Sequence, residues 1–177
     1  MDHLANRIGS QNCGLAYFYF DTQDQEHQTA ENVFASLLKQ LVLRSKYESP
    51  TVNNMYDRHI ACNTMPDFNE FLASIKSVCK LLSETFIVLD ALDEAEDHCR
   101  RKVLTGLSSI FDHVKILATG RPYIAELQYF KFSSNIGIQA NDDDLRRYLE
   151  SELMEKELTE NLKEMIVTKL LMKTNGL

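Results

Sequence analysis

The chain has 177 residues, of which 44% are hydrophobic and 25% charged, and these values are typical of a folded domain. Its net charge is −7 and its Lys and Arg residues are scattered, so duplex nucleic acid is not expected as a partner. No run approaches 18 apolar residues, so we expect no membrane span. This length allows one domain, or one domain and the start of another.

Strand and helix patterns alternate along the first half of the chain. An apolar residue at every third or fourth position indicates a helix, and an aromatic-rich run between turn residues indicates a strand. In chain order we expect the end of a helix over 1–8, a strand over 15–20, a polar loop over 21–28, a helix capped by Thr29, a weaker helix over 51–60, and a helix opened by Pro66-Asp67 with Glu70 completing a variant capping box.

The second half begins with the same alternation and ends in helices alone. In chain order we expect a strand over 85–90, a helix over 95–111, a strand over 114–119, a short helix over 123–129, a strand over 132–138, a helix from Asn141 and a helix capped by Thr159. This order predicts an α/β fold: a three-layer parallel sheet with right-handed crossovers, followed by the start of a helical region. We place the first domain at 1–140 and the helical appendage at 141–177.

The most informative segment is an apolar run that leads directly into carboxylates. Phe86 to Leu89 reads as a strand buried on both faces, and Asp90, Asp93 and Glu94 follow it. Open α/β sheets bind ligands at the carboxyl ends of their strands, where acidic groups hold Mg²⁺ beside a nucleotide phosphate. This is the form of a Walker B motif. A P-loop also needs glycine followed by lysine, and none of the six glycines here has a lysine after it.

Other residues that bind metals or form disulfides show no site pattern. The four cysteines lack CxxC spacing, so free thiols in a reducing cytosol are the better interpretation and predict a cytoplasmic protein. The five histidines show no HExxH-type spacing. Asp142 to Asp144 are better explained as the first turn of a helix than as a metal cluster, because carboxylates there interact favourably with the helix dipole.

Several motifs, in this order, resemble the NACHT domains of STAND-type P-loop NTPases. The strand Leu15 to Asp21 and the helix Thr29 to Leu41 are similar to those of the nephrocystin-like N-terminal group, which is common in ankyrin and WD-repeat proteins. Asp90 to Glu94 looks like the family's Walker B motif. The segment Ala118-Thr119-Gly120-Arg121-Pro122 looks like its sensor motif, with Gly120 in place of a serine.

The resemblance implies roles for five side chains. Asp90 would hold Mg²⁺ through a water, Asp93 would be the base or would position water, and Glu94 lies beside it as a second catalytic candidate. Arg121 would sense the terminal phosphate, because a guanidinium matches phosphate oxygens in a bidentate fork. Thr119 is the other cofactor-binding candidate. The simpler alternatives are that Asp93 caps the following helix and that Arg121 is a salt-bridged surface residue.

The resemblance also implies that the chain begins just after the P-loop. In the family the P-loop strand lies between the sensor strand and the last strand. We therefore expect either direct pairing of 114–119 with 132–138 or a loosely attached C-terminal third. Mg²⁺ and ATP are the cofactors of the intact family, and we expect this chain alone to bind neither tightly.

Three functions remain open at this stage. The first is a fragment of a NACHT-type signalling switch. The second is a non-enzymatic interaction or scaffold module, whose protein partners are a second copy or repeat and effector domains. The third, and weakest, is an unrelated Mg²⁺ phosphohydrolase that uses Asp90, Asp93 and Glu94.

Overall fold

The computed structural model describes residues 12–45, 48–121, 134–138, 141–154, 156 and 158–174. The described residues up to 121 belong to one compact unit, and those from Ser134 onward belong to a second. The first unit contains β1 (Cys13–Tyr19), η1 (Thr22–His27), α2 (Ala30–Arg44), α3 (Pro50–Cys62), α4 (Phe68–Cys79), β2 (Glu84–Asp90), η2 (Leu92–Glu94), α5 (Asp97–Ser108), η3 (Phe111–His113) and β3 (Lys115–Ala118). The second contains α6 (Asp142–Met154) and α7 (Glu160–Thr174).

The three strands form one parallel sheet in the order β1-β2-β3. Ala16 is opposite Ile87 in the register of the first pair, and Ile87 is opposite Ile116 in that of the second. The connections from β1 to β2 and from β2 to β3 step across the sheet in the same direction. Right-handed connections therefore place the helices of both on the same face of the sheet. The predicted α/β fold with a parallel sheet, followed by helices, is confirmed.

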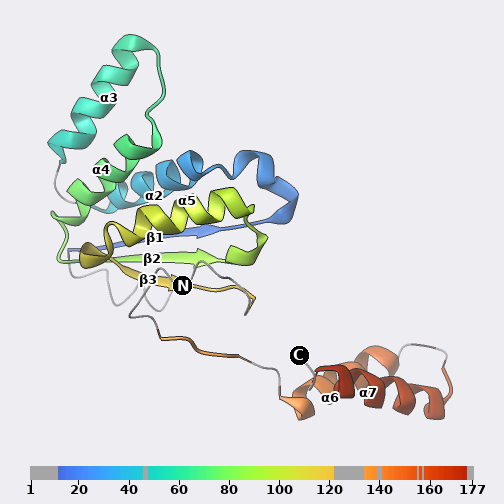
Figure 1. Ribbon diagram of the computed structural model, residues 1–177. Helices are drawn as coiled ribbons and strands as arrows, with labels where there is room; N and C mark the ends of the chain where they lie inside the picture. The colour runs from blue at the N-terminus through green and yellow to red at the C-terminus, as the bar shows by residue number, and fades with distance from the viewer. Residues whose placement is uncertain are drawn as a thin grey trace. The chain divides into compact units, whose positions relative to one another are not determined.

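The main core of the first unit lies between this face of the sheet and α2, α4 and α5 (Figure 1). Alternate strand residues such as Ala16, Ile87 and Leu89 point into it, as the two-residue period of a strand requires. The apolar stripes of the helices supply the rest. The side chains with no exposed surface include Val33, Phe34, Leu37, Leu41, Ile75, Val103, Leu104 and Leu107.

Local capping signals fix where two of these helices begin. The side chain of Thr29 accepts a hydrogen bond from the Asn32 N–H, so α2 starts at the predicted cap. In α4 the Asp67 carboxylate accepts from the Glu70 N–H, and the Glu70 carboxylate accepts from the Asp67 N–H. This is the reciprocal capping box that the sequence predicted.

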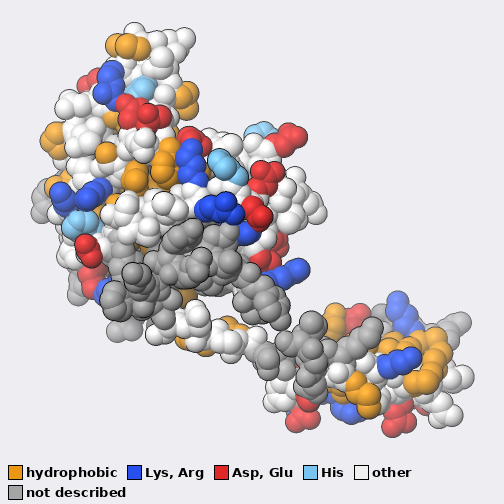
Figure 2. Space-filling model, in the orientation of Figure 1, with side chains coloured by type: hydrophobic (Ala, Val, Ile, Leu, Met, Phe, Trp, Pro, Cys, Tyr) orange, Lys and Arg blue, Asp and Glu red, His pale blue; other side chains and the backbone are white. Residues whose placement is uncertain are grey.

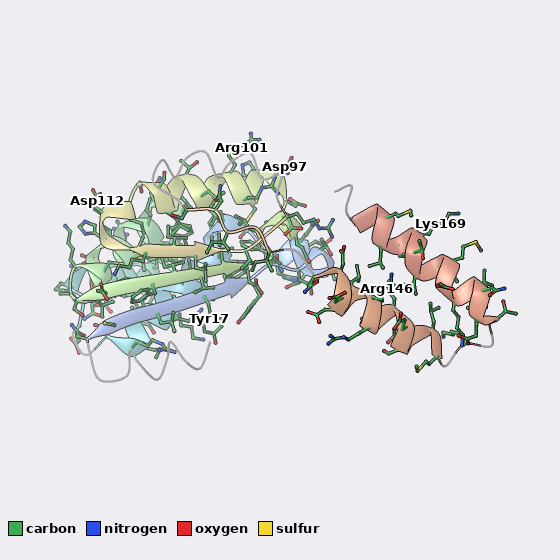
Figure 3. The ribbon with its side chains drawn as sticks, turned by 90° about the horizontal axis from the view of Figure 1, so that it is seen from below. Tyr17, Asp97, Arg101, Asp112, Arg146 and Lys169 are labelled. Carbon is green, nitrogen blue, oxygen red and sulfur yellow. The ribbon has the colours of Figure 1, made fainter. Side chains whose placement is uncertain are left out.

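The outer edge of β1 is occupied by a side chain of α2. Gln40 accepts the Tyr17 N–H at 3.1 Å through Oε1 and donates to the Tyr17 carbonyl at 2.8 Å through Nε2. The amide therefore satisfies both backbone groups that would otherwise be available to another strand. Tyr17 projects from β1 on the sheet face opposite the helices (Figure 3).

Two sequence predictions need correction. The segment 21–28, expected as a loop, contains the short helix η1. A strand was predicted over 132–138, but residues 134–138 form none. For these residues the predicted strand is wrong, and so is its direct pairing with 114–119. Ile136 and Ile138 are 84% and 92% exposed, so their alternation does not mark a buried face. Residues 132 and 133 and the helices predicted over 1–8 and 123–129 lie outside the described residues.

The second unit is a pair of helices, α6 and α7. The Asn141 side chain accepts from the Asp143 N–H, and Asp142 to Asp144 form the first turn of α6, as expected. Val167 and Leu171 on α7 are buried. The domain boundary at residue 140 stays a prediction. None of the helices in the described part of the chain combines the length and the hydrophobicity that a membrane span requires.

We expect alkylation to distinguish one cysteine from the other three. No disulfide joins any of the four cysteines; Cys62 is exposed, whereas Cys13, Cys79 and Cys99 are buried. Burial, and secondarily the Glu31 and Glu96 carboxylates, raises the pKa of Cys99 to about 11, so little of its reactive thiolate exists at neutral pH. Iodoacetamide should modify Cys62 first, which peptide mass spectrometry would show. Equally fast labelling of Cys99 in the folded chain would contradict this burial.

Candidate functional site

The predicted site residues meet at the carboxyl edge of the sheet. β2 ends at Asp90, β3 ends one residue before Thr119, and η1 follows the end of β1. Parallel pairing places these ends side by side, because all three strands run in the same direction. Figure 2 shows acidic side chains gathered on this side of the first unit, with basic ones among them.

Thr119 joins the end of β3 to the end of β2. Its hydroxyl donates to the Asp90 carboxylate and accepts the Ala91 N–H at 3.0 Å. Its backbone N–H donates to the Leu89 carbonyl, and its carbonyl accepts the Leu92 N–H, both at 2.9 Å. Four hydrogen bonds therefore fix this residue against the loop that carries the acidic motif.

Asp93 and Arg121 are paired with each other. The Arg121 side chain places Nε 3.2 Å from Asp93 Oδ2, and the Arg121 backbone N–H donates to Asp93 Oδ1 at 3.2 Å. The Asp93 side chain is 21% exposed, whereas that of Arg121 is 85% exposed. The structure thus brings together the candidate base and the candidate phosphate sensor, and the pairing is also what a salt-bridged Arg121 predicts.

Glu94 faces a different neighbour, the segment after β1. Its carboxylate accepts the Thr22 N–H at 3.1 Å, and its backbone carbonyl accepts from the Gln25 side chain at 3.1 Å. Sequence reasoning missed Thr22 and Gln25. The signal that could have found them is their place in a polar segment directly after a strand, on the edge where the other strands end.

The loop between these carboxylates contains a strained residue. Ala91 has a φ of 53°, in the left-handed region that costs a residue with a Cβ roughly 1–2 kcal/mol. Its N–H bond to Thr119 helps to hold it there. Strain of this kind gathers at functional loops.

Replacing Ala91 with glycine should therefore raise the free energy of unfolding, by about 0.5–1 kcal/mol after the greater flexibility of the unfolded glycine chain is subtracted. Urea denaturation followed by circular dichroism measures the change. Ala35→Gly, in the regular helix α2, is the matched control and should destabilise. A loss of stability for Ala91→Gly equal to that of the control would refute the strain.

The donor set fits Mg²⁺ only as a partner of a phosphate. Among the residues that the structure describes, no three His, Cys, Asp or Glu side chains are grouped closely enough to hold a metal ion. Asp90 with the Thr119 hydroxyl offers hard oxygen donors, which suit an ion that takes its other ligands from water and substrate. Arg121 offers the guanidinium that a phosphate would need.

These features define an α/β domain with a parallel sheet and an acidic loop at its carboxyl edge. The chain belongs to the family described as nephrocystin 3, N-terminal, whose sequence profile matches residues 1–121. The matched region ends at Arg121, so it includes every side chain of the candidate site. No curated protein matches the chain.

Proposed function

We propose that this chain is part of a cytoplasmic NACHT-type NTPase signalling switch, and that its carboxyl edge is the half of the site that meets Mg²⁺ and the terminal phosphate. The observation that carries the proposal is the meeting of the acidic loop with the segment from Thr119 to Arg121. Four hydrogen bonds of Thr119 and the pair of Asp93 with Arg121 join them.

The division of roles follows from charge. Asp90 would hold Mg²⁺ through a water, with the Thr119 hydroxyl fixing one carboxylate oxygen. Arg121 would contact the terminal phosphate, and its cationic head supplies the positive charge that an otherwise acidic edge needs. The sequence contains no glycine followed by lysine. It therefore has no P-loop motif to supply the backbone amides and the lysine that cradle phosphates. Tight ATP binding by this chain alone is therefore not expected.

The test is an amide nuclear magnetic resonance titration with Mg²⁺ and a non-hydrolysable ATP analogue. We expect shifts at Asp90 to Asp93 and at Thr119 to Arg121, with a dissociation constant on the order of 1 mM. Asp90→Asn should weaken binding several-fold. Asp112→Asn is the control, because Asp112 is an exposed acid at the opposite end of α5 from Asp97 (Figure 3). Micromolar affinity would contradict the expected weak binding, and no shifts at the edge would contradict the proposed site.

The alternative is a scaffold module that binds other proteins and no nucleotide. One observation favours it: each acidic side chain of the site has a partner within the chain, namely Thr119 for Asp90, Arg121 for Asp93 and the Thr22 N–H for Glu94. These contacts explain the carboxylates as parts of the fold. Under this alternative Asp90→Ala leaves partner binding unchanged, and light scattering would reveal self-association in the absence of nucleotide.

A further inference from the structure

The pairing of Asp93 with Arg121 has an unusual geometry. Both carboxylate oxygens of Asp93 are used, one by the backbone N–H of Arg121 and one by Nε of the same residue. We propose that Asp93 is a positioning residue that orients the Arg121 guanidinium toward a phosphate, and that it is not the base of the site. This inference rests on the proposed phosphate contact of Arg121.

Asp93 is poorly placed to act on a water molecule. Its side chain is 21% exposed, and η2, a single short turn, holds it facing Arg121. A general base must lie within hydrogen-bond reach of the proton that it removes. Here Oδ1 accepts from the Arg121 backbone N–H and Oδ2 forms an ion pair with Nε of the same residue, so the carboxylate is directed at Arg121.

The same contacts leave the outer end of the guanidinium available. Arginine has five N–H donors, of which the one on Nε lies on the side of the guanidinium that faces Asp93, with Nε 3.2 Å from Oδ2. The two terminal nitrogens have no partner among the described residues, and the side chain is 85% exposed. Fixing Nε removes part of the rotamer freedom of the side chain while the fork that binds two phosphate oxygens stays open.

The backbone beneath Arg121 is fixed as well. Thr119, two residues earlier, is joined to the β2 loop by four hydrogen bonds, and the Arg121 N–H is held by Asp93 itself. The guanidinium is therefore anchored at its Nε edge and at its main chain. An exposed arginine without these contacts has to be ordered by the anion that it binds.

The direction in which removing the Asp93 carboxylate changes anion affinity distinguishes a positioning role from simple proximity. A carboxylate near an anion site repels the anion, so removing an Asp93 that is merely nearby would tighten anion binding. Removing Asp93 would also tighten anion binding if Asp93 competed with phosphate for Arg121. Removing a residue that pre-orders the guanidinium weakens binding instead, despite the loss of a negative charge.

The experiment follows the Nε–H resonance of Arg121 in the whole chain during a titration with pyrophosphate. In the unaltered chain this proton should exchange slowly with water, and pyrophosphate should shift it. Asp93→Ala should speed this exchange and weaken pyrophosphate binding roughly three- to tenfold. The loss is expected because the anion would then have to order the arginine side chain itself, at a cost in rotamer entropy. Asp93→Asn keeps an acceptor oxygen and should fall between the two, and backbone amide spectra of both variants check that they fold.

Asp112→Ala removes an equal charge from an exposed residue outside the site, so pyrophosphate binding should stay unchanged or tighten slightly. Tighter or equal binding by Asp93→Ala would overturn the positioning role while leaving the phosphate contact intact. A rapidly exchanging Arg121 Nε–H in the unaltered chain would overturn it too. If Arg121 is ordered but pyrophosphate does not shift it, both the proposed phosphate contact and this inference fail.

Discussion

Replacing Phe34 with alanine is expected to lower the free energy of unfolding by about 3–5 kcal/mol. Phe34 lies in α2 with no exposed surface, at the point where α2, α4 and α5 meet above the sheet. Its ring centroid is 4.8 Å from that of Phe68, so the substitution also removes an aromatic pair. Neighbouring helices fill such a cavity only partly, which is why the cost exceeds the lost transfer energy.

This loss is a large share of the roughly 5–15 kcal/mol that holds a domain folded. Urea denaturation followed by circular dichroism measures it, and the variant should unfold at a much lower urea concentration. Leu43→Ala in the same helix is the control: its side chain is 76% exposed, and its effect should stay within about 0.5 kcal/mol. A difference below about 1 kcal/mol between the two variants would contradict the core position of Phe34.

Local patterns predicted most of the fold correctly, because each reports a physical need within a few residues. The apolar stripe that includes Val33, Phe34 and Leu37 marks the face of α2 that is buried, and Thr29 begins that helix. The capping box of Asp67 and Glu70 likewise begins α4. The apolar run before Asp90 became the middle strand, β2.

The missed helix η1 begins at a local cap, where the Asp21 side chain accepts the Gln23 N–H. The error over 132–138 has a different cause, because a strand depends on a distant partner. Ile136 and Ile138 alternate as a strand would, but a strand needs a neighbour for its backbone groups, and alternation alone does not provide one. The pairing of Gln40 with the Tyr17 backbone has no local signal either, since the two residues lie on different elements.

The candidate site shows the same division. The sequence predicted Asp90 and Asp93 at the carboxyl end of a buried strand, and the resemblance to a sensor motif made Thr119 a candidate. That Asp93 would use both oxygens on Arg121 could not be predicted, because the pairing depends on the path of the chain after β3. The catalytic roles of Asp93 and Glu94 therefore stay predictions, and the contacts of both residues with their own chain argue for roles in holding the site together.

Replacing Gly106 with alanine should lower the free energy of unfolding by about 1–3 kcal/mol, although helix propensity alone favours alanine by nearly 1 kcal/mol. Gly106 is buried in α5, where a Cβ would lie 2.7 Å from Cζ of Phe68 and 2.9 Å from Cζ of Phe34. Both rings lie in or against the packed core, so neither can move aside without opening a cavity or straining a rotamer. The steric cost therefore exceeds the gain in propensity.

A double-mutant cycle tests whether the clash is the cause. Phe68→Leu shortens the side chain that the new methyl group would meet first, so Gly106→Ala should destabilise this background less than it destabilises the unaltered chain. Thr105→Ala, an exposed position of the same helix, reports the effect of propensity without the clash. A coupling energy near zero between residues 106 and 68 would mean that α5 shifts as a whole to accept the methyl group. In that case α5 could move relative to α2 and α4 more easily than the close contacts of Gly106 indicate.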